Sequence, residues 1–210
     1  MFTNVITSLR NAVRHVREDV RTAREKDPAA RSTAAVLTYP GLHAVWLHRA
    51  EHALWERGHT FTARTLSHVT RFLTGVEIHP AATLGRRVFV DHGMNTVIGE
   101  TAAVGDDVHM FHGVTLGGND PRPVKRHPTV EDGATLGANS TLLGDITVGK
   151  GATVGAGAVV TDDVPAGVTV AGNPARIVSG PGGDEEERAR PTATEEGDPE
   201  ADPDPTTVCC

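Results

Sequence analysis

A six-residue hydrophobic repeat dominates residues 76–178. A branched or bulky apolar residue returns at every sixth position, often followed by glycine, and a small or branched residue stands four places further on. An α-helix repeats its apolar face about every 3.6 residues and a strand every second residue. A short flat strand followed by a turn fits the longer period, and such hexapeptide repeats build a β-solenoid. The clearest run is Val130, Leu136, Leu142, Val148, Val154 and Val160.

Two interruptions of this repeat hold most of its polar chemistry. The interval before Ile98 is two residues too long, and the interval before Val130 is eight residues too long. Insertions in a solenoid form loops on one face, which is often the binding face. We therefore expect the functional loops at residues 91–95 and 117–128.

Helical periodicity fills the first 75 residues. Apolar residues three and four apart predict an amphipathic helix over residues 5–23, which the Asp27-Pro28 dipeptide ends. A second helix is predicted from Pro40 to Arg57, and a third from an N-cap at Thr60 to Gly75. The predicted domains are thus a helical segment (1–75), a solenoid (76–178) and a tail (179–210).

The charge lies unevenly along the chain. Ten acidic residues and two arginines give residues 179–210 a charge of −8, which leaves +1 for the remainder. The nearly neutral charge of residues 1–178 argues against a nucleic-acid partner, which would require a basic patch. The tail has no aromatic residue and only Val208 from the set Ile, Leu and Val, so we predict that it is disordered.

Nothing in the sequence indicates export or membrane insertion. The only cysteines are Cys209 and Cys210, which cannot frame a disulfide-stabilised fold. No apolar run approaches the length of a membrane span, and residues 1–26 carry charges throughout instead of the apolar core of a signal peptide. We expect a cytoplasmic protein.

Glu77 and His92 form a candidate catalytic pair. A coil of three hexapeptides holds roughly 18 residues, so residues fifteen apart can meet at a corner of the solenoid. A carboxylate beside an imidazole fixes its tautomer and stabilises its charged form, as a general base requires. Spacing alone leaves open that both are surface residues without such a role.

Several ordered motifs together resemble the serine O-acetyltransferase family over residues 20–178. They are Gly75–Gly85, Val90–Thr101, Gly113–Gly118, Arg126–Pro128, Ala171–Arg176 and, in the helical segment, Lys26–Arg31. The resemblance implies an α+β protein in which a left-handed parallel β-helix follows the helical segment. It also implies transfer of acetyl from acetyl-CoA to the hydroxyl of L-serine, giving O-acetylserine in cysteine biosynthesis.

The resemblance also implies roles for individual residues. His92 would take the proton of the serine hydroxyl and return it to the coenzyme A thiolate, while Glu77 holds its imidazole. A guanidinium would bind the substrate carboxylate, two aspartates would face its ammonium, and a second histidine would contact the hydroxyl or the developing oxyanion. These substrate-binding residues are Arg126, Asp27, Asp91 and His127.

Cofactor and partner expectations follow from the same resemblance. The coenzyme would lie against Gly117, Gly118, Ala138 and Ala156, and no metal is expected. The family implies a homotrimer, or a dimer of trimers, with active sites between subunits. Because the chain ends in Thr207–Cys210 and not in isoleucine, a complex with the pathway's sulfhydrylase is doubtful. His112 stands where the family commonly has glutamine.

Other functions remain open at this stage. One is acyl transfer to a sugar or another hydroxyl, against which Arg126 beside His127 argues by supplying a carboxylate clamp. Another is a metal-dependent carbonic anhydrase on the same scaffold, with three histidines on a metal between subunits. The four candidates for such a site are His92, His109, His112 and His127. The i, i+4 pair of His48 and His52 could also bind a metal, but without a third ligand nearby we favour packed or solvated histidines.

Overall fold

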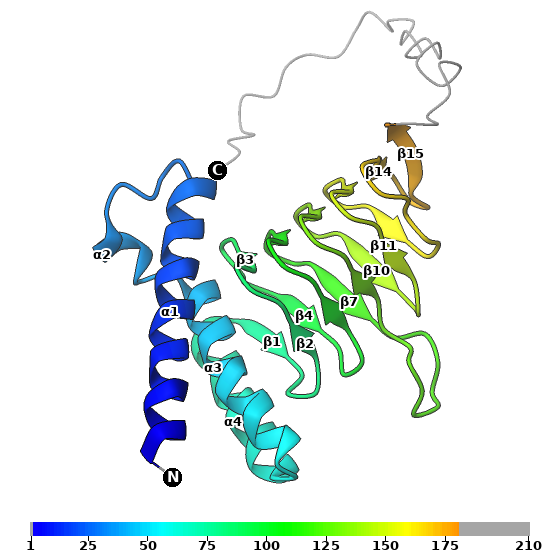
Figure 1. Ribbon diagram of the computed structural model, residues 1–210. Helices are drawn as coiled ribbons and strands as arrows, with labels where there is room; N and C mark the ends of the chain where they lie inside the picture. The colour runs from blue at the N-terminus through cyan, green and yellow to red at the C-terminus, as the bar shows by residue number, and fades with distance from the viewer. Residues whose placement is uncertain (1, 181–210) are drawn as a thin grey trace, which may run out of the picture.

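Four helices precede the solenoid in the computed structural model, which describes residues 2–180 (Figure 1). They are α1 (Phe2–Lys26), α2 (Thr33–Val36), α3 (Pro40–Glu56) and α4 (Thr60–Thr74). The three predicted helices are confirmed, and the short α2 is an addition. The expected N-cap at Thr60 is wrong, since His59 takes that position and makes no capping hydrogen bond through its side chain. The predicted tail and its two cysteines lie outside the described residues.

The solenoid consists of short strands that pair in parallel with every third strand along the chain. Three sheets result: sheet A has the order β1-β4-β7-β10-β13, sheet B β11-β8-β5-β2 and sheet C β15-β14-β12-β9-β6-β3. The last pair, β14 and β15, is antiparallel and closes the end of the stack. The strands are β1 (Val76–Ile78), β2 (Thr83–Leu84), β3 (Phe89–Val90), β4 (Thr96–Ile98), β5 (Ala103–Val104), β6 (His109–Met110), β7 (Thr115–Gly117), β8 (Thr129–Val130), β9 (Thr135–Leu136), β10 (Thr141–Leu143), β11 (Thr147–Val148), β12 (Thr153–Val154), β13 (Val159–Val160), β14 (Thr169–Ala171) and β15 (Arg176–Ser179).

The residues of the six-residue repeat form the core. Every member of the run from Val130 to Val160 is at most 2% exposed, and Ala134 and Ser140, which represent the second set of positions, are fully buried. Burying a leucine or valine side chain stabilises a fold by about 1.5–3 kcal/mol. Because each coil buries similar side chains, each coil stabilises the solenoid by a similar amount. The predicted solenoid is confirmed.

Helix α3 connects the helical segment to the first coil. A Cβ on Gly41 would lie 1.9 Å from the carbonyl oxygen of Val90, so the start of α3 touches the backbone of β3 directly. At the other side of α3, Trp46 Nε1 donates a hydrogen bond to Asp19 of α1 at 2.9 Å, and Arg49 binds the same carboxylate. The helices therefore hold the end of β3, where the first insertion begins. Among the described helices, none is both long and apolar enough to cross a membrane.

Candidate active site

The two insertions lie at different corners of the solenoid. Residues 91–95 connect β3 of sheet C to β4 of sheet A, at what we call the C/A corner. Residues 118–128 connect β7 of sheet A to β8 of sheet B, at the A/B corner, and this loop projects from the stack of coils (Figure 1). The site residues predicted from the sequence divide between these corners.

Asp91 and His92 begin the C/A corner. The Asp91 side chain is 18% exposed and that of His92 is 74% exposed, with 3.9 Å between Oδ1 and Nε2. This distance is too long for a hydrogen bond. The His92 imidazole is therefore open to a substrate, with a carboxylate close by.

Asp27 lies near the same corner, just after α1. The Tyr39 hydroxyl donates a hydrogen bond to its Oδ2, and the Ala29 N–H donates to its Oδ1 at 2.7 Å. These hydrogen bonds, that of Tyr39 first, lower the pKa of Asp27, and the bond to Asp27 raises the pKa of Tyr39 to about 12. His92 and Asp91 both act electrostatically on this pair. The structure thus brings Asp27, Asp91 and His92 together.

The backbone of the C/A corner occupies the left-handed region. His92 has φ 59° and Asn95 φ 63°, and such conformations cost a non-glycine residue about 1–2 kcal/mol. Contacts with β1 hold the corner in place: a Cβ on Gly93 would lie 2.8 Å from Cγ2 of Val76, and the Asn95 N–H donates to the Gly75 carbonyl at 2.9 Å. The position of His92 is set by packed backbone.

Two further histidines lie near this corner, but only one joins the site. The His112 ring makes a T-shaped contact with the His92 ring, with 5.9 Å between centroids and an interplanar angle of 80°. The His109 ring lies 5.1 Å from that of Phe89 and 4.5 Å from that of Phe111. This imidazole packs between the two aromatic side chains, and its burial lowers the pKa of His109.

Arg126 lies at the A/B corner. Its Nη2 donates to Glu100 Oε2 at 2.7 Å and its Nη1 to the Asp120 carbonyl at 3.3 Å. The hydrogen bond from Arg126 is the main reason that the pKa of Glu100 is lowered. Within the described residues, the buried Nε of Arg126 has no hydrogen-bond partner, and Nη1 and Nη2 each carry one further N–H beyond these two hydrogen bonds.

Thr101 fixes the tautomer of His127. The Thr101 N–H lies 3.2 Å from His127 Nδ1, which must accept this bond. A neutral ring then carries its proton on Nε2, and burial, with the charge of Arg126, favours the neutral ring by lowering the pKa of His127. A Cβ on Gly118 would lie only 3.1 Å from this Nε2, so glycine leaves the donor uncovered. The sequence did not predict roles for Thr101 or Glu100.

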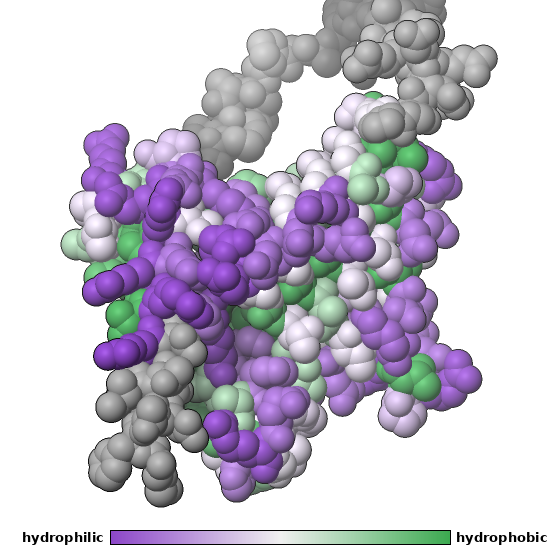
Figure 2. Space-filling model, in the orientation of Figure 1, coloured by the Kyte–Doolittle hydropathy of each residue, from purple (hydrophilic) through white to green (hydrophobic). Residues whose placement is uncertain are grey.

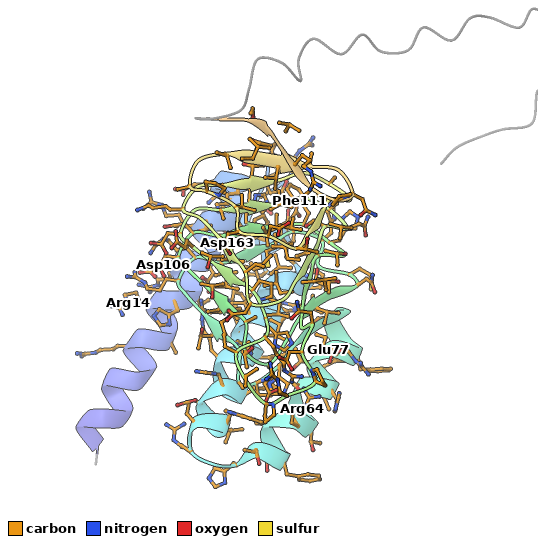
Figure 3. All side chains as sticks on the ribbon, turned by 90° about the vertical axis from the view of Figure 1, so that its right-hand side faces the viewer. Arg14, Arg64, Glu77, Asp106, Phe111 and Asp163 are labelled. Carbon is orange, nitrogen blue, oxygen red and sulfur yellow. The ribbon has the colours of Figure 1, made fainter. Side chains whose placement is uncertain are left out.

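Glu77 points outward from the middle of β1, between buried Val76 and Ile78. Its Oε2 accepts a hydrogen bond from Arg71 Nη1 of α4 at 2.9 Å. Figure 3 shows it at the α4 end of the molecule, where Arg64 also lies. No hydrogen bond joins Glu77 to His92 within residues 2–180, so the expected pair stays a prediction for the assembled protein.

The predicted coenzyme residues also divide between the corners. The N–H groups of Asn139 and Gly157 donate to the carbonyls of His112 and Ala138 at 2.9 and 2.8 Å. His112, Ala138 and Ala156 therefore occupy equivalent positions on successive coils at the C/A corner. The other two coenzyme residues, Gly117 and Gly118, lie at the A/B corner.

The predicted site residues thus form two half-sites on one chain. At about 3.3 Å per residue, a three-residue strand of sheet A separates the corners by roughly 10 Å, which is too far for direct hydrogen bonds. The C/A half-site comprises Asp27, Asp91, His92, Ala138 and Ala156. The A/B half-site comprises Arg126, His127, Gly117 and Gly118.

A single chain does not assemble the metal sites considered from the sequence. His109 lies among phenyl rings and His127 lies at the other corner, so the four candidate histidines do not converge within one chain. His48 and His52 donate instead to backbone carbonyls of the first coil at 3.1 and 2.7 Å. In the described part of the chain, no three His, Cys, Asp or Glu side chains are grouped to hold an ion.

Comparison with known proteins places this hexapeptide solenoid among the transferases. The family model for the bacterial transferase hexapeptide (six repeats) matches residues 127–162. The serine acetyltransferase of Bacillus pumilus is 57% identical over 164 residues, which cover 78% of this chain and 76% of that protein. The enzyme of the same name from Mycobacterium tuberculosis is 50% identical over 164 residues, 78% of this chain and 72% of that one.

Solved structures agree with these relatives. Serine acetyltransferase from Neisseria gonorrhoeae in complex with serine is 39% identical with a TM-score of 0.78, covering 80% of this chain and 69% of that one. The enzyme from Brucella abortus in complex with coenzyme A is 38% identical with a TM-score of 0.81, covering 87% and 74%. The chain is a hexapeptide-repeat acyltransferase. Within that class it belongs to the serine acetyltransferase family.

Proposed function

We propose that this chain transfers the acetyl group of acetyl-CoA to the hydroxyl of L-serine, which gives O-acetylserine for cysteine biosynthesis. The observation that carries the proposal is the exposed His92 imidazole beside Asp91 and Asp27 at an insertion of the solenoid. The related structures that contain serine and coenzyme A support both substrates.

His92 acts as the general base. It takes the proton of the serine hydroxyl as the oxygen attacks the thioester carbonyl carbon, and it returns this proton to the sulfur as the C–S bond breaks. The imidazole can approach a substrate because 74% of its side chain is exposed. Glu77 stabilises the imidazolium in the assembled enzyme, where it exchanges its Arg71 partner for His92.

Four side chains recognise the amino acid. The carboxylates of Asp27 and Asp91 face its ammonium, and the lowered pKa of Asp27 keeps that group charged. Arg126 binds its carboxylate through the planar guanidinium, in which Nη1 and Nη2 each carry a second N–H besides the one donated to Asp120 or Glu100. The Nε2–H of His127 donates to the hydroxyl oxygen or to the oxyanion.

A homotrimer, alone or as a dimer of trimers, completes the site. Since the half-sites lie at opposite ends of sheet A, the C/A corner of one copy must meet the A/B corner of the next. Figure 2 shows pale and green residues over the side of the solenoid, away from the purple surface of α1. The outward side chains of sheet A are largely uncharged, as in the centre of protein interfaces. They are Glu77, Val97, Thr115, Thr141, Leu143 and Val159.

Acetyl-CoA binds along the same junction. The methyl side chains of Ala138 and Ala156 leave room beside the C/A corner of one copy, and Gly117 and Gly118 leave room at the A/B corner of the next. Small residues there let a pantetheine arm approach the backbone closely. The thioester then lies next to His92.

A thiol-release assay tests the function. Wild-type protein with acetyl-CoA should release thiol with serine, and much more slowly with homoserine or a hexose. His92→Ala should lower this rate by about 10²–10⁴-fold, as expected for loss of a general base, whereas His59→Ala, at an exposed turn, should not. A preference for the hexose would instead favour a sugar acyltransferase, and an active His92→Ala would remove the assigned base.

A further inference from the structure

Five arginines form a stripe along one face of α1. They stand alternately four and three residues apart, so a single side of the helix carries all of them. All five are exposed, and Figure 2 shows a hydrophilic surface over this helix. The members of this arginine stripe are Arg10, Arg14, Arg17, Arg21 and Arg24.

Acidic side chains on α1 neutralise the arginine stripe only in part. Glu25 binds Arg21, with 2.7 Å between Oε1 and Nε. Glu18 binds Arg86 of the first coil, with 2.6 Å between Oε1 and Nη2, and lies 3.9 Å from Arg14. Because Arg86 holds one of these two glutamates, the face keeps an excess of positive charge.

A groove of about 550 Å³ lies along this face of α1. The opposite side of the helix is taken up by the protein, since Ala23 is fully buried and Val20 packs against the same small core. The helix therefore has no free apolar face to insert into a membrane, and the groove offers mainly guanidinium groups, which bind carboxylates well. Its lining residues are Arg10, Val13, Arg14, Arg17, Glu18 and Arg21.

The end of the same chain carries the complementary charge. Residues 195–204, which lie outside the described part of the chain, contain six acidic residues and no basic one. From Glu196 to Asp204 an acidic residue stands at every second position, separated by glycine, alanine or proline. At about 3.1 Å per residue, as in an extended proline-containing segment, this stretch spans about 25 Å. The stripe from Arg10 to Arg24 spans about 21 Å at the helical rise of about 1.5 Å per residue, so the two rows of charge match in length.

The connecting chain is long enough to bring this segment to α1. Strands β15 and β3 are five strand spacings apart in sheet C, or about 24 Å, and Figure 1 shows α1 at the end of the stack opposite to β15. Glu195 follows Gly180 by fifteen residues, which can extend over about 50 Å. The other acidic group, residues 184–187, follows it by at most seven residues, or about 25 Å, which is too short to lie along the stripe.

We propose that residues 195–204 dock on the arginine stripe of α1. Each exposed ion pair of this kind is weak and is screened by salt, but the covalent link gives the segment an effective concentration of about millimolar at the stripe. Docking therefore covers the basic face of α1 at low salt and releases it at high salt. A free polyanion, such as a nucleic acid, must displace the chain's own segment to bind there.

Energy transfer within the full chain tests this docking. Both tryptophans lie on α3, where Trp46 contacts α1, and the only cysteines are the last two residues of the chain. Cys210→Ser leaves Cys209 for a single dye that accepts tryptophan emission. We expect transfer at about 20 mM salt and a fall of at least about twofold at about 1 M, where charges are screened within about 3 Å. Replacing the six acidic residues of 195–204 by Asn and Gln should give the low value at both salt concentrations, whereas the same change at residues 184–187 should not.

Charge reversal on the helix completes the test. Arg17→Glu with Arg21→Glu should abolish the salt-sensitive transfer, while the matched pair Arg122→Glu with Arg176→Glu, at exposed arginines away from α1, should keep it. Circular dichroism checks that each variant is folded. Transfer that does not depend on salt, or that both pairs of substitutions lower equally, would overturn the proposal. Binding of a DNA duplex or of anionic vesicles to the stripe, without transfer in the wild-type sequence, would assign the stripe to another partner and overturn it as well.

Discussion

Buried imidazoles couple the stability of this fold to pH. His48 is 2% exposed where α3 meets the first coil, and burial, together with the nearby His52, lowers its pKa to about 3. His79 lies on the first coil, and burial, followed by the charge of Arg64, lowers its pKa to about 4. An unfolded histidine titrates near 6.5, so between about pH 6.5 and pH 3 the unfolded chain binds more protons than the folded one. The stability that the neutral, buried rings of these two histidines contribute is fully present above about pH 6.5. It is lost as the pH falls from there towards pH 3.

His48→Gln should flatten this dependence. Glutamine can keep a donor towards the Ala82 carbonyl, which His48 Nε2 contacts at 3.1 Å, but it does not titrate. We expect the wild-type free energy of unfolding in urea to fall between about pH 7 and pH 5, with roughly 1–2 kcal/mol of the loss due to His48. The fall should be smaller in His48→Gln and unchanged in His59→Gln. An equal fall in all three proteins would contradict the assignment.

The sequence indicates candidate residues at the insertions but not the residues that position them. His92, Arg126 and His127 stand where the six-residue period fails, and the family resemblance implies their roles. Glu100 and Thr101 lie within a regular coil, and their contacts with Arg126 and His127 arise only when coils stack 26 residues apart. The pairing of Glu77 with Arg71 depends on how α4 meets β1, which no periodicity encodes.

At the scale of elements, α3 positions the corner that carries His92. Helix α3 begins at Pro40, and the next residue, Gly41, contacts the backbone of Val90, immediately before Asp91. The amphipathic pattern predicted this helix well, but not which turn of it would touch the solenoid. A side chain at this glycine must push the helix or the corner away.

Gly41→Ala should therefore lower activity through geometry. Its Cβ would lie 1.9 Å from the Val90 carbonyl oxygen, and a displacement of about 1 Å at a catalytic group can cost roughly 100-fold in rate. We expect kcat for serine-dependent thiol release to fall by about 10- to 100-fold. Gly58→Ala is the control, because its left-handed φ of 81° makes it strained while no atom lies near its Cβ. If both variants lose activity equally, general instability is the cause.

A ladder of aspartates joins successive coils at the corner between sheets B and C. Asp106 Oδ1 accepts the Arg86 N–H at 2.8 Å, and Asp132 Oδ1 accepts the Asp106 N–H at 2.8 Å. Figure 3 shows Asp106 across the solenoid from Phe111, which precedes His112 at the C/A corner. These carboxylates cap backbone donors that the turns leave unpaired, and they lie away from the proposed site.

Asp132→Ala should destabilise the solenoid without affecting catalysis. Loss of the acceptor leaves the Asp106 N–H without its partner, and comparable losses of side-chain caps cost about 0.5–2 kcal/mol. Asp132→Asn keeps an oxygen at the same place. Its free energy of unfolding should therefore fall by less than half as much as that of Asp132→Ala. Urea unfolding measures both changes, and thiol release by the folded variants should match the wild type. Equal losses for Asn and Ala would show that charge, and not the hydrogen bond, matters.

At the scale of the whole molecule, the division of the site makes complementation possible. Each chain carries one C/A and one A/B half-site at opposite ends of sheet A, so each active site of a trimer would combine corners of two chains. His92→Ala inactivates only the first corner and Arg126→Ala only the second. Co-expressed with different affinity tags and purified as mixed oligomers, the two inactive chains should recover activity. In trimers assembled at random from equal amounts of the two variants, a junction is intact only when Arg126→Ala supplies its C/A corner and His92→Ala its A/B corner. This combination has a probability of about one quarter, so we expect roughly a quarter of the wild-type rate. If every site instead used both corners of a single chain, no mixture would exceed the activity of the separate variants.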